Sequence, residues 1–239
     1  MYSIEPTEPT PQAGQATLGE QAFDLLQTAI IRGDIETGTR VSEADLMTRF
    51  ALGRAPVREA MQRLQARGLI VRRPHAGAKI ISLSAQQLDE LYLVREALEG
   101  MACRLAATAM TDEELRSLRE LLEQHADEIR REGGLEYYQR EGDFDFHYRI
   151  IAGCKNEQLA RQLTGDLYHL LRLYRYRLST LRGRPERALK EHMRVLDALD
   201  ERDPDLAELL MRRHISAARN NLLTRLSATT LLQNRSSQP

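Results

Sequence analysis

One carboxylate and three imidazoles in the second half of the chain have the residue types and spacing of a metal site. Asp143 and His147 are four residues apart in the segment GDFDFHYRI, so on a helix they point to the same surface spot. His192 and His214 lie in two later helical segments, among leucine, valine, methionine and isoleucine residues. Together the four side chains could bind a divalent ion and leave a coordination position for a ligand. Zinc is the first choice for this set, and nickel and manganese are the alternatives.

The same four residues also have an ordinary interpretation. An Asp/His pair at this spacing is more often a surface pair or a satisfied contact in the core. A single histidine at helical spacing is usually structural. The residue pattern alone leaves both interpretations open.

A second set of residues carries the charge needed to bind nucleic acid. Between residues 54 and 79 the chain has seven Lys/Arg residues and one acid, Glu59, whereas the whole chain has 34 bases and 35 acids. A nearly neutral protein therefore concentrates positive charge in one segment. Such a concentration is typical of a protein that binds DNA or RNA.

The elements that position this charge can be predicted locally. Pro56 suits the first turn of a helix that begins after Gly53. Its apolar face follows the helical period at Val57, Ala60, Met61 and Leu64. Arg54 and Arg58 project together near the N-terminal end, where arginine can bind guanine bidentately in the major groove. Gly68 is a candidate C-cap. A basic hairpin then follows, with strands over 69–73 and 79–81 and a turn at Pro74–Gly77.

Two more helices are predicted upstream of this segment. An apolar stripe from Ala22 to Ile30 ends at Gly33, and Ser42 starts a second helix with Asp45 in capping-box spacing. Three helices followed by a hairpin form a winged helix-turn-helix, and an ordinary solvated arginine face is the weaker alternative. The candidate DNA-binding residues are Arg40, Arg54, Arg58, Gln62, His75 and Gly77.

Composition and termini limit the class of protein. No apolar run is long enough to span a membrane, and the N-terminus lacks the layout of a signal peptide. Cys103 and Cys154 do not form a disulfide framework, so we expect a reducing, cytoplasmic location. We expect a disordered arm over residues 1–16, a winged helix-turn-helix over 17–82, a helical domain over 83–228 and a flexible tail over 229–239.

The second domain is predicted to be an all-α bundle. Helical patterns broken by glycines and prolines indicate about six helices, and no strand pattern is convincing. The expected helices cover residues 85–109, 111–132, 135–153, 156–181, 185–201 and 203–227. Thr111 has the sequence context of a capping-box start. The fold class is therefore mainly α, with a small winged domain first.

Both parts resemble known families. The segment ALGRAPVREAMQRLQARGLI is similar to the core of a GntR-type winged helix, and the remainder resembles the FCD ligand-binding domain of the FadR subfamily. One departure is Gly53, where members of the family commonly carry serine. A glycine N-cap satisfies the helix less well and removes a hydroxyl that could contact phosphate.

The resemblance assigns roles to the candidate residues. Asp143, His147, His192 and His214 fall in order on the metal-ligand positions of the FCD domain, which implies a divalent metal that helps to hold a small organic acid. Arg95 could bind such an acid bidentately, or it could pair with Glu99 four residues on. The weaker effector-binding candidates are Tyr92, Tyr168 and Arg172.

The resemblance also implies a mode of action. We expect a homodimer that binds a double-stranded operator with an inverted repeat and responds to a small organic acid. Likeness to regulators beside propionate or 2-methylcitrate genes suggests a di- or tricarboxylate. Relief of repression by the ligand is the commoner polarity in this family. Two other classes compete with this regulator: a metal-dependent enzyme with a DNA-binding head, and a dimeric DNA-binding protein that senses nothing. We expect no enzymatic activity, because no general base is placed beside the metal ligands.

Overall fold

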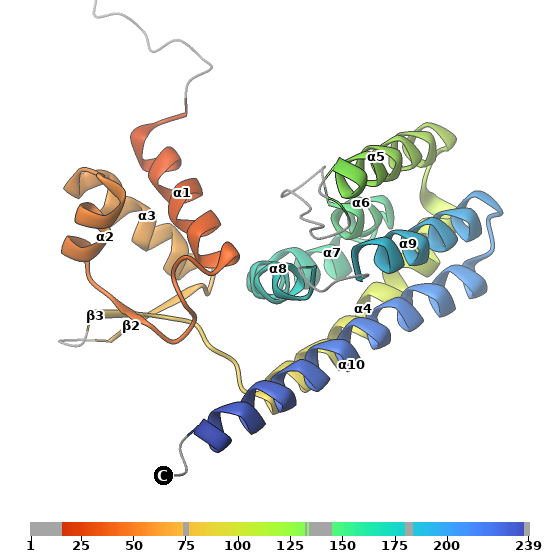
Figure 1. Cartoon of the computed structure of the whole chain (residues 1–239). Coiled ribbons are helices and arrows are strands. Elements are labelled where there is room, and N and C mark those ends of the chain that lie inside the picture. Colours follow the sequence, from red (N-terminus) through yellow and green to blue (C-terminus); the bar gives the residue numbers. More distant parts are fainter. Residues whose placement is uncertain (1–15, 74–76, 132, 134–144, 180–183, 237–239) are drawn as a thin grey trace, which may run out of the picture.

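The computed structural model describes residues 16–73, 77–131, 133, 145–179 and 184–236. An N-terminal head with a small sheet stands beside a larger helical bundle (Figure 1). The expected mainly α fold, a winged helix-turn-helix followed by an all-α bundle, is confirmed. The expected arm over residues 1–16 lies almost wholly outside the described residues.

The head is built from three helices and three strands. In chain order they are α1 (Leu18–Arg32), β1 (Arg40–Val41), α2 (Glu43–Phe50), α3 (Arg54–Ala66), β2 (Ile70–Arg73) and β3 (Gly77–Ile80). Thr17 and Ser42 form capping boxes that start α1 and α2. Gly33 ends α1 with a φ of 89°, a left-handed conformation that favours glycine.

The sheet has the order β1-β3-β2, and both pairs are antiparallel. The strand pair β2 and β3 is the predicted hairpin, whereas β1 is a third strand that the sequence pattern did not indicate. Arg40 on β1 lies opposite Lys79 on β3. Because like charges directly opposite each other destabilise a strand pair, this position favours an anion nearby.

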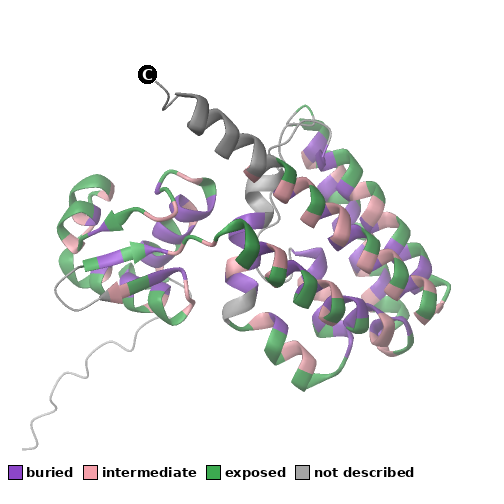
Figure 2. Cartoon of the chain, turned by 90° about the horizontal axis from the view of Figure 1, so that it is seen from below, coloured by how far each residue is buried: buried purple, intermediate pink, exposed green. Residues whose placement is uncertain are grey.

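Seven helices form the bundle within the described residues. They are α4 (Ala85–Ala109), α5 (Asp112–Arg131), α6 (Phe146–Gly153), α7 (Glu157–Thr164), α8 (Asp166–Ser179), α9 (Arg184–Asp200) and α10 (Pro204–Ser236). Helices α4 and α10 run side by side along the bundle (Figure 1). Buried residues follow the facing sides of the helices (Figure 2).

Three helices differ from the expected ranges. The helix expected over 135–153 is not continuous, because Asp145 has the extended backbone of an N-cap (φ −111°, ψ 119°) and α6 begins only at Phe146. The helical four-residue spacing that was used to pair Asp143 with His147 therefore does not apply. The predicted helix over 156–181 is divided at Gly165, whose φ of −77° and ψ of −146° are not helical. The last helix was expected to end at 227, and α10 instead continues to Ser236. It therefore extends into the segment expected to be a flexible tail.

The head and the bundle meet at α8. This helix packs against α1. The backbone N–H of Leu83, in the segment that joins the two parts, donates a 2.8 Å hydrogen bond to the Tyr174 hydroxyl oxygen on α8. A structural change in α8 would therefore act directly on the placement of the head. None of the described helices combines the length and the apolar character needed to cross a membrane.

Candidate metal centre and nucleic-acid interface

Three of the four predicted metal ligands converge inside the bundle. His147 lies in the first turn of α6, His192 in the middle of α9 and His214 in the first third of α10. All three are buried, and one ligand nitrogen of each lies within 4.8 Å of the others. Asp143, the fourth predicted ligand, lies outside the described residues. His147, His192 and His214 therefore form one buried cluster.

The distances fit a metal site. The Nε2 atoms of His192 and His214 are 3.2 Å apart. Two nitrogens bound to one tetrahedral zinc at about 2.0–2.1 Å lie roughly 3.3–3.4 Å apart. The His192 and His214 pair thus has the spacing of two ligands of a zinc-sized ion, which would leave positions for His147, Asp143 or a small ligand.

Burial favours the neutral form of His192 and His214. Burial lowers the pKa of His192 well below its ordinary value, and His214 and His147 lower it further. Burial also lowers the pKa of His214, although the hydrogen bond with Glu191 partly offsets this effect. A neutral imidazole has a lone pair for a metal, whereas a protonated one does not.

Asp145 helps to position His147. Its carboxylate caps α6, with Oδ1 accepting a 2.9 Å hydrogen bond from the backbone N–H of His147. Its other oxygen accepts a 3.2 Å hydrogen bond from the Tyr168 hydroxyl on α8. Asp145 is fully buried. Sequence reasoning missed this residue, although an aspartate directly before a helix is a recognisable capping signal.

Arg95 reaches the same cluster from α4. It is fully buried, and its Nε donates to Glu99 Oε1 at 2.6 Å. Its Nη2 atom lies 3.3 Å from His147 Nδ1, and its guanidinium lies over the Tyr92 ring. Both predicted roles of Arg95, pairing with Glu99 and binding an organic acid, are compatible with this geometry. Arg95 pairs with Glu99, and its Nη1 atom has no hydrogen-bond partner among the described residues.

The other effector-binding candidates lie close by. Tyr92 on α4 is fully buried next to Arg95, and Tyr168 and Arg172 are buried on α8. The Arg172 guanidinium lies over the Tyr168 ring at 5.8 Å. Tyr168 is joined to the metal cluster through Asp145. The structure therefore brings all four candidates to the surroundings of one buried site.

Five of the six predicted DNA-binding residues lie among the described residues of the head. Arg54, Arg58 and Gln62 are exposed and follow one another at four-residue spacing along α3. Arg40 is exposed on β1, and Gly77 starts β3 with a φ of 73°, which explains the glycine. His75 lies outside the described residues.

Two arginines of the basic segment do not belong to this surface. Arg63 and Arg67 turn toward α1, where their guanidinium groups lie over the Phe23 ring at 4.9 and 4.5 Å. Arg63 also approaches Glu20 and Glu59 at 3.9 Å. These two positive charges stabilise the packing of α3 on α1 and are not available in the same way to DNA.

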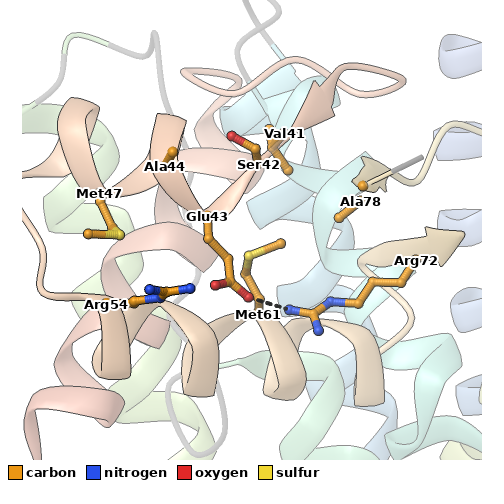
Figure 3. Close-up of a pocket in the computed structure, with 10 residues that line it drawn as sticks. Val41, Ser42, Glu43, Ala44, Met47, Arg54, Met61, Arg72 and Ala78 are labelled. Carbon is orange, nitrogen blue, oxygen red and sulfur yellow. Dashed lines mark ion pairs between the residues drawn. The ribbon is translucent and has the colours of Figure 1, made fainter. Parts of the chain in front are cut away.

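A groove lies between α2, α3 and the β2–β3 hairpin (Figure 3). Glu43 at the start of α2 lies between Arg54 and Arg72, and its Oε1 atom is 3.6 Å from Arg72 Nη2. Both partners of this ion pair are about one-third exposed, so its own contribution to stability is small, about 0–1 kcal/mol. This ion pair connects the β2–β3 hairpin to α2 beside Arg54.

Gly53 is the N-cap of α3 and makes no side-chain capping hydrogen bond. Its φ of −71° suits any residue, and an added Cβ would meet only Pro56, at 3.6 Å. We therefore expect Gly53→Ser to raise the free energy of unfolding by a few tenths of a kcal/mol, because a serine oxygen can accept from a free N–H of the first turn. Urea denaturation measures this change, and Gly53→Ala is the control without a hydroxyl. A serine variant no more stable than the alanine variant contradicts the capping argument.

These two features, a winged helix with an exposed arginine face and a helical bundle with a buried histidine cluster, are typical of a DNA-binding transcriptional regulator. The bacterial regulatory protein gntR family matches residues 18–80, and the FCD domain matches residues 90–217. The chain belongs to the GntR family of transcriptional regulators, in the group that carries an FCD domain. It is a regulator and not an enzyme.

Known relatives cover most of the chain. The HTH-type transcriptional repressor RspR of Escherichia coli K12 is 30% identical over 212 residues, covering 89% of this chain and 88% of the relative. A probable D-xylose utilization operon transcriptional repressor of Paenarthrobacter nicotinovorans is 29% identical over 205 residues, covering 85% and 88%. The solved structure of E. coli McbR/YncC has a TM-score of 0.68 at 21% identity, covering 89% and 100%, which supports the fold.

Proposed function

We propose that this protein is a metal-dependent sensor of a small carboxylate that represses a metabolic operon. In this proposal a homodimer binds an inverted-repeat operator through two winged helices, and the effector releases it. The relatives named above are described as repressors, which supports the direction of regulation. The effector, the metal and the dimer are our inferences.

The observation that carries the proposal is the buried cluster of His147, His192 and His214 beside Arg95. A divalent ion in this cluster, with zinc the first choice and nickel or manganese the alternatives, would attract a carboxylate. Arg95 Nη1 would donate to the other end of the same ligand, since it has no partner among the described residues. The predicted ligand Asp143 would complete the coordination.

The size of the effector follows from the distribution of cationic groups. Arg172 on α8 is a second buried guanidinium, and Tyr92 and Tyr168 add phenolic hydroxyls around the site. Two arginines and a metal are suited to a ligand with more than one carboxylate. This supports the expected di- or tricarboxylate, of the kind found in propionate or 2-methylcitrate metabolism.

DNA recognition is assigned to one face of the head. Arg54, Arg58 and Gln62 form an exposed row along α3, as needed for contacts to base edges in the major groove. Arg40 lies opposite Lys79 across the sheet, a like-charge pair that a DNA phosphate would neutralise. The wing residues assigned to DNA are His75 and Gly77.

Helix α8 provides the route between the two sites. Tyr168 on this helix donates to Asp145, which caps the helix that carries His147. Farther along, Tyr174 accepts from the Leu83 N–H, and the helix packs against α1 of the head. An effector that moved α8 would therefore move the head. The coupling required is modest, about 1–3 kcal/mol, for a 5–150-fold change in DNA affinity.

The proposal is tested by a thermal-shift screen of small mono-, di- and tricarboxylates against the zinc-loaded protein and against protein treated with a chelator. We expect at least one di- or tricarboxylate to raise the melting temperature of the zinc-loaded protein, because a ligand that binds only the folded state stabilises it. The chelated protein should not respond.

Two outcomes separate the alternatives. If a carboxylate stabilises the zinc-loaded and the chelator-treated protein equally, the metal takes no part in effector binding. No response from either form favours a bundle that only dimerises, which is the non-sensing alternative. Fluorescence anisotropy, measured in parallel, then shows whether the effector lowers or raises the affinity of the protein for DNA.

A further inference from the structure

His147 and His214 each contact a glutamate carboxylate through their Nδ1 atom, and each of these glutamates also pairs with an arginine. In the first set, Glu99 Oε2 lies 2.6 Å from His147 Nδ1, and Arg95 Nε donates to Glu99 Oε1 at 2.6 Å. The side chains of Arg95 and Glu99 are 1% and 4% exposed. Both come from α4, whereas His147 comes from α6, so the contact joins two helices.

The second set repeats this order of residues at the other side of the cluster. Glu191 Oε2 lies 2.7 Å from His214 Nδ1, and Arg184 Nη1 donates to the same oxygen at 2.9 Å. Arg184 and Glu191 come from α9 and His214 from α10. The third histidine is oriented differently, because the Phe146 ring stacks on His192 with a centroid distance of 4.2 Å.

These contacts decide which imidazole nitrogens face a metal. A carboxylate accepts a hydrogen bond, so the contact keeps a proton on Nδ1 and leaves the lone pair on Nε2. The Nε2 atom of His214 already lies 3.2 Å from that of His192. The Nε2 atoms of His192 and His214 therefore lie side by side, and the Nδ1 atoms of His147 and His214 face the glutamates.

We propose that Glu99 and Glu191 are positioning residues of the metal site: they fix the tautomer and ring orientation of His147 and His214 and make both imidazoles stronger ligands. This inference rests on the proposed function, since it requires that the cluster binds a metal. A carboxylate behind a ligating histidine raises the basicity of that histidine, and removal of such a group weakens metal affinity by about 10–100-fold.

Stabilisation of the fold explains the two arginine–glutamate–histidine sets less well than the positioning of metal ligands does. A buried ion pair such as Arg95–Glu99 is often no more stabilising than apolar side chains of similar volume, because both charges lose water. An interaction that orients a ligand has a direct effect on metal binding whatever its effect on folding. The same order, arginine to glutamate to histidine, on two separate pairs of helices also favours a shared role.

The test uses Glu99→Gln and Glu191→Gln, which keep the shape of the side chain and remove its charge. Zn²⁺ affinity of the full chain is measured by competition with a chromophoric chelator, and Co²⁺ absorption spectra report the coordination geometry. We expect each variant to bind Zn²⁺ about 10–100-fold more weakly than the wild type, with an altered Co²⁺ spectrum. The melting temperature of the metal-free protein is recorded alongside, because a purely structural role would change that value and leave the spectrum unchanged.

Matched controls come from the same helices. Glu90→Gln on α4 and Glu186→Gln on α9 change exposed glutamates and should leave Zn²⁺ affinity as in the wild type. If both test variants keep wild-type Zn²⁺ affinity and Co²⁺ spectra, the positioning role is refuted while the metal site stands. A wild-type chain that binds no Zn²⁺ refutes the metal site itself. Should one variant fail to fold, the other decides, because the two glutamates serve different histidines.

Discussion

A chain in which His192 and His214 are both replaced by alanine should bind no zinc after dialysis, whereas the wild type should retain about one ion per chain. The physical reason is the loss of two of three converging imidazoles, which leaves too few ligands for a tetrahedral ion. The stabilisation that zinc gives should be lost with it. At a free zinc concentration of 100 times the dissociation constant that stabilisation is about 2.7 kcal/mol.

Metal content by mass spectrometry and melting curves with and without zinc measure both effects. His169→Ala is the matched control, because His169 is also buried in the bundle but does not belong to the three-histidine cluster. It should keep its ion. Retention of a full equivalent of zinc by the double variant contradicts the site.

Replacing Arg58 with alanine should abolish sequence preference at one base position of each half-site while leaving metal content intact. Arg58 is exposed on α3, one turn after Arg54, and pairs with no described residue. Its guanidinium is thus available for bidentate contact with guanine in the major groove. The expected loss of specific affinity is about 1–3 kcal/mol, or roughly 5–150-fold.

The measurement starts from an operator that the wild-type protein selects out of random DNA. Fluorescence anisotropy then compares the selected and scrambled sequences over a range of salt concentrations. Arg63→Ala is the matched control, since Arg63 turns toward Phe23 on α1 and should affect stability rather than base preference. Equal weakening on all sequences, with a smaller salt dependence, would identify Arg58 as a phosphate contact and exclude base recognition.

The head was largely predictable because its signals are local. Capping boxes at Thr17 and Ser42 and a glycine at position 33 depend only on residues a few positions apart. It was harder to predict which arginines face solvent and which pack against α1. Charge counting treats Arg58 and Arg63 alike, but their positions on opposite sides of α3 direct one to solvent and the other to Phe23.

In the histidine cluster, too, local sequence predicts some features, whereas others depend on how the helices pack. The helical pattern allowed His147, His192 and His214 to face the interior of the bundle, and the structure brings one ligand nitrogen of each within 4.8 Å of the others. Glu191 directly precedes His192 in the sequence, but neighbouring side chains on a helix diverge, so Glu191 is not expected to contact His192. That argument holds, and for the same reason Glu191 reaches His214 on the next helix.

The sequence by itself determined the three helices of the head, the capping boxes at Thr17 and Ser42, the concentration of basic residues between 54 and 79, and the histidines that are available for the buried cluster. These depend on period, capping chemistry and charge, which act within a few residues along the chain. Tertiary structure alone decided that Asp145 would connect α6 to Tyr168, that Glu99 would face His147, and that Gly165 would divide α7 from α8. Such outcomes depend on which helix faces lie within hydrogen-bonding distance after packing, and residues far apart in the chain meet only there.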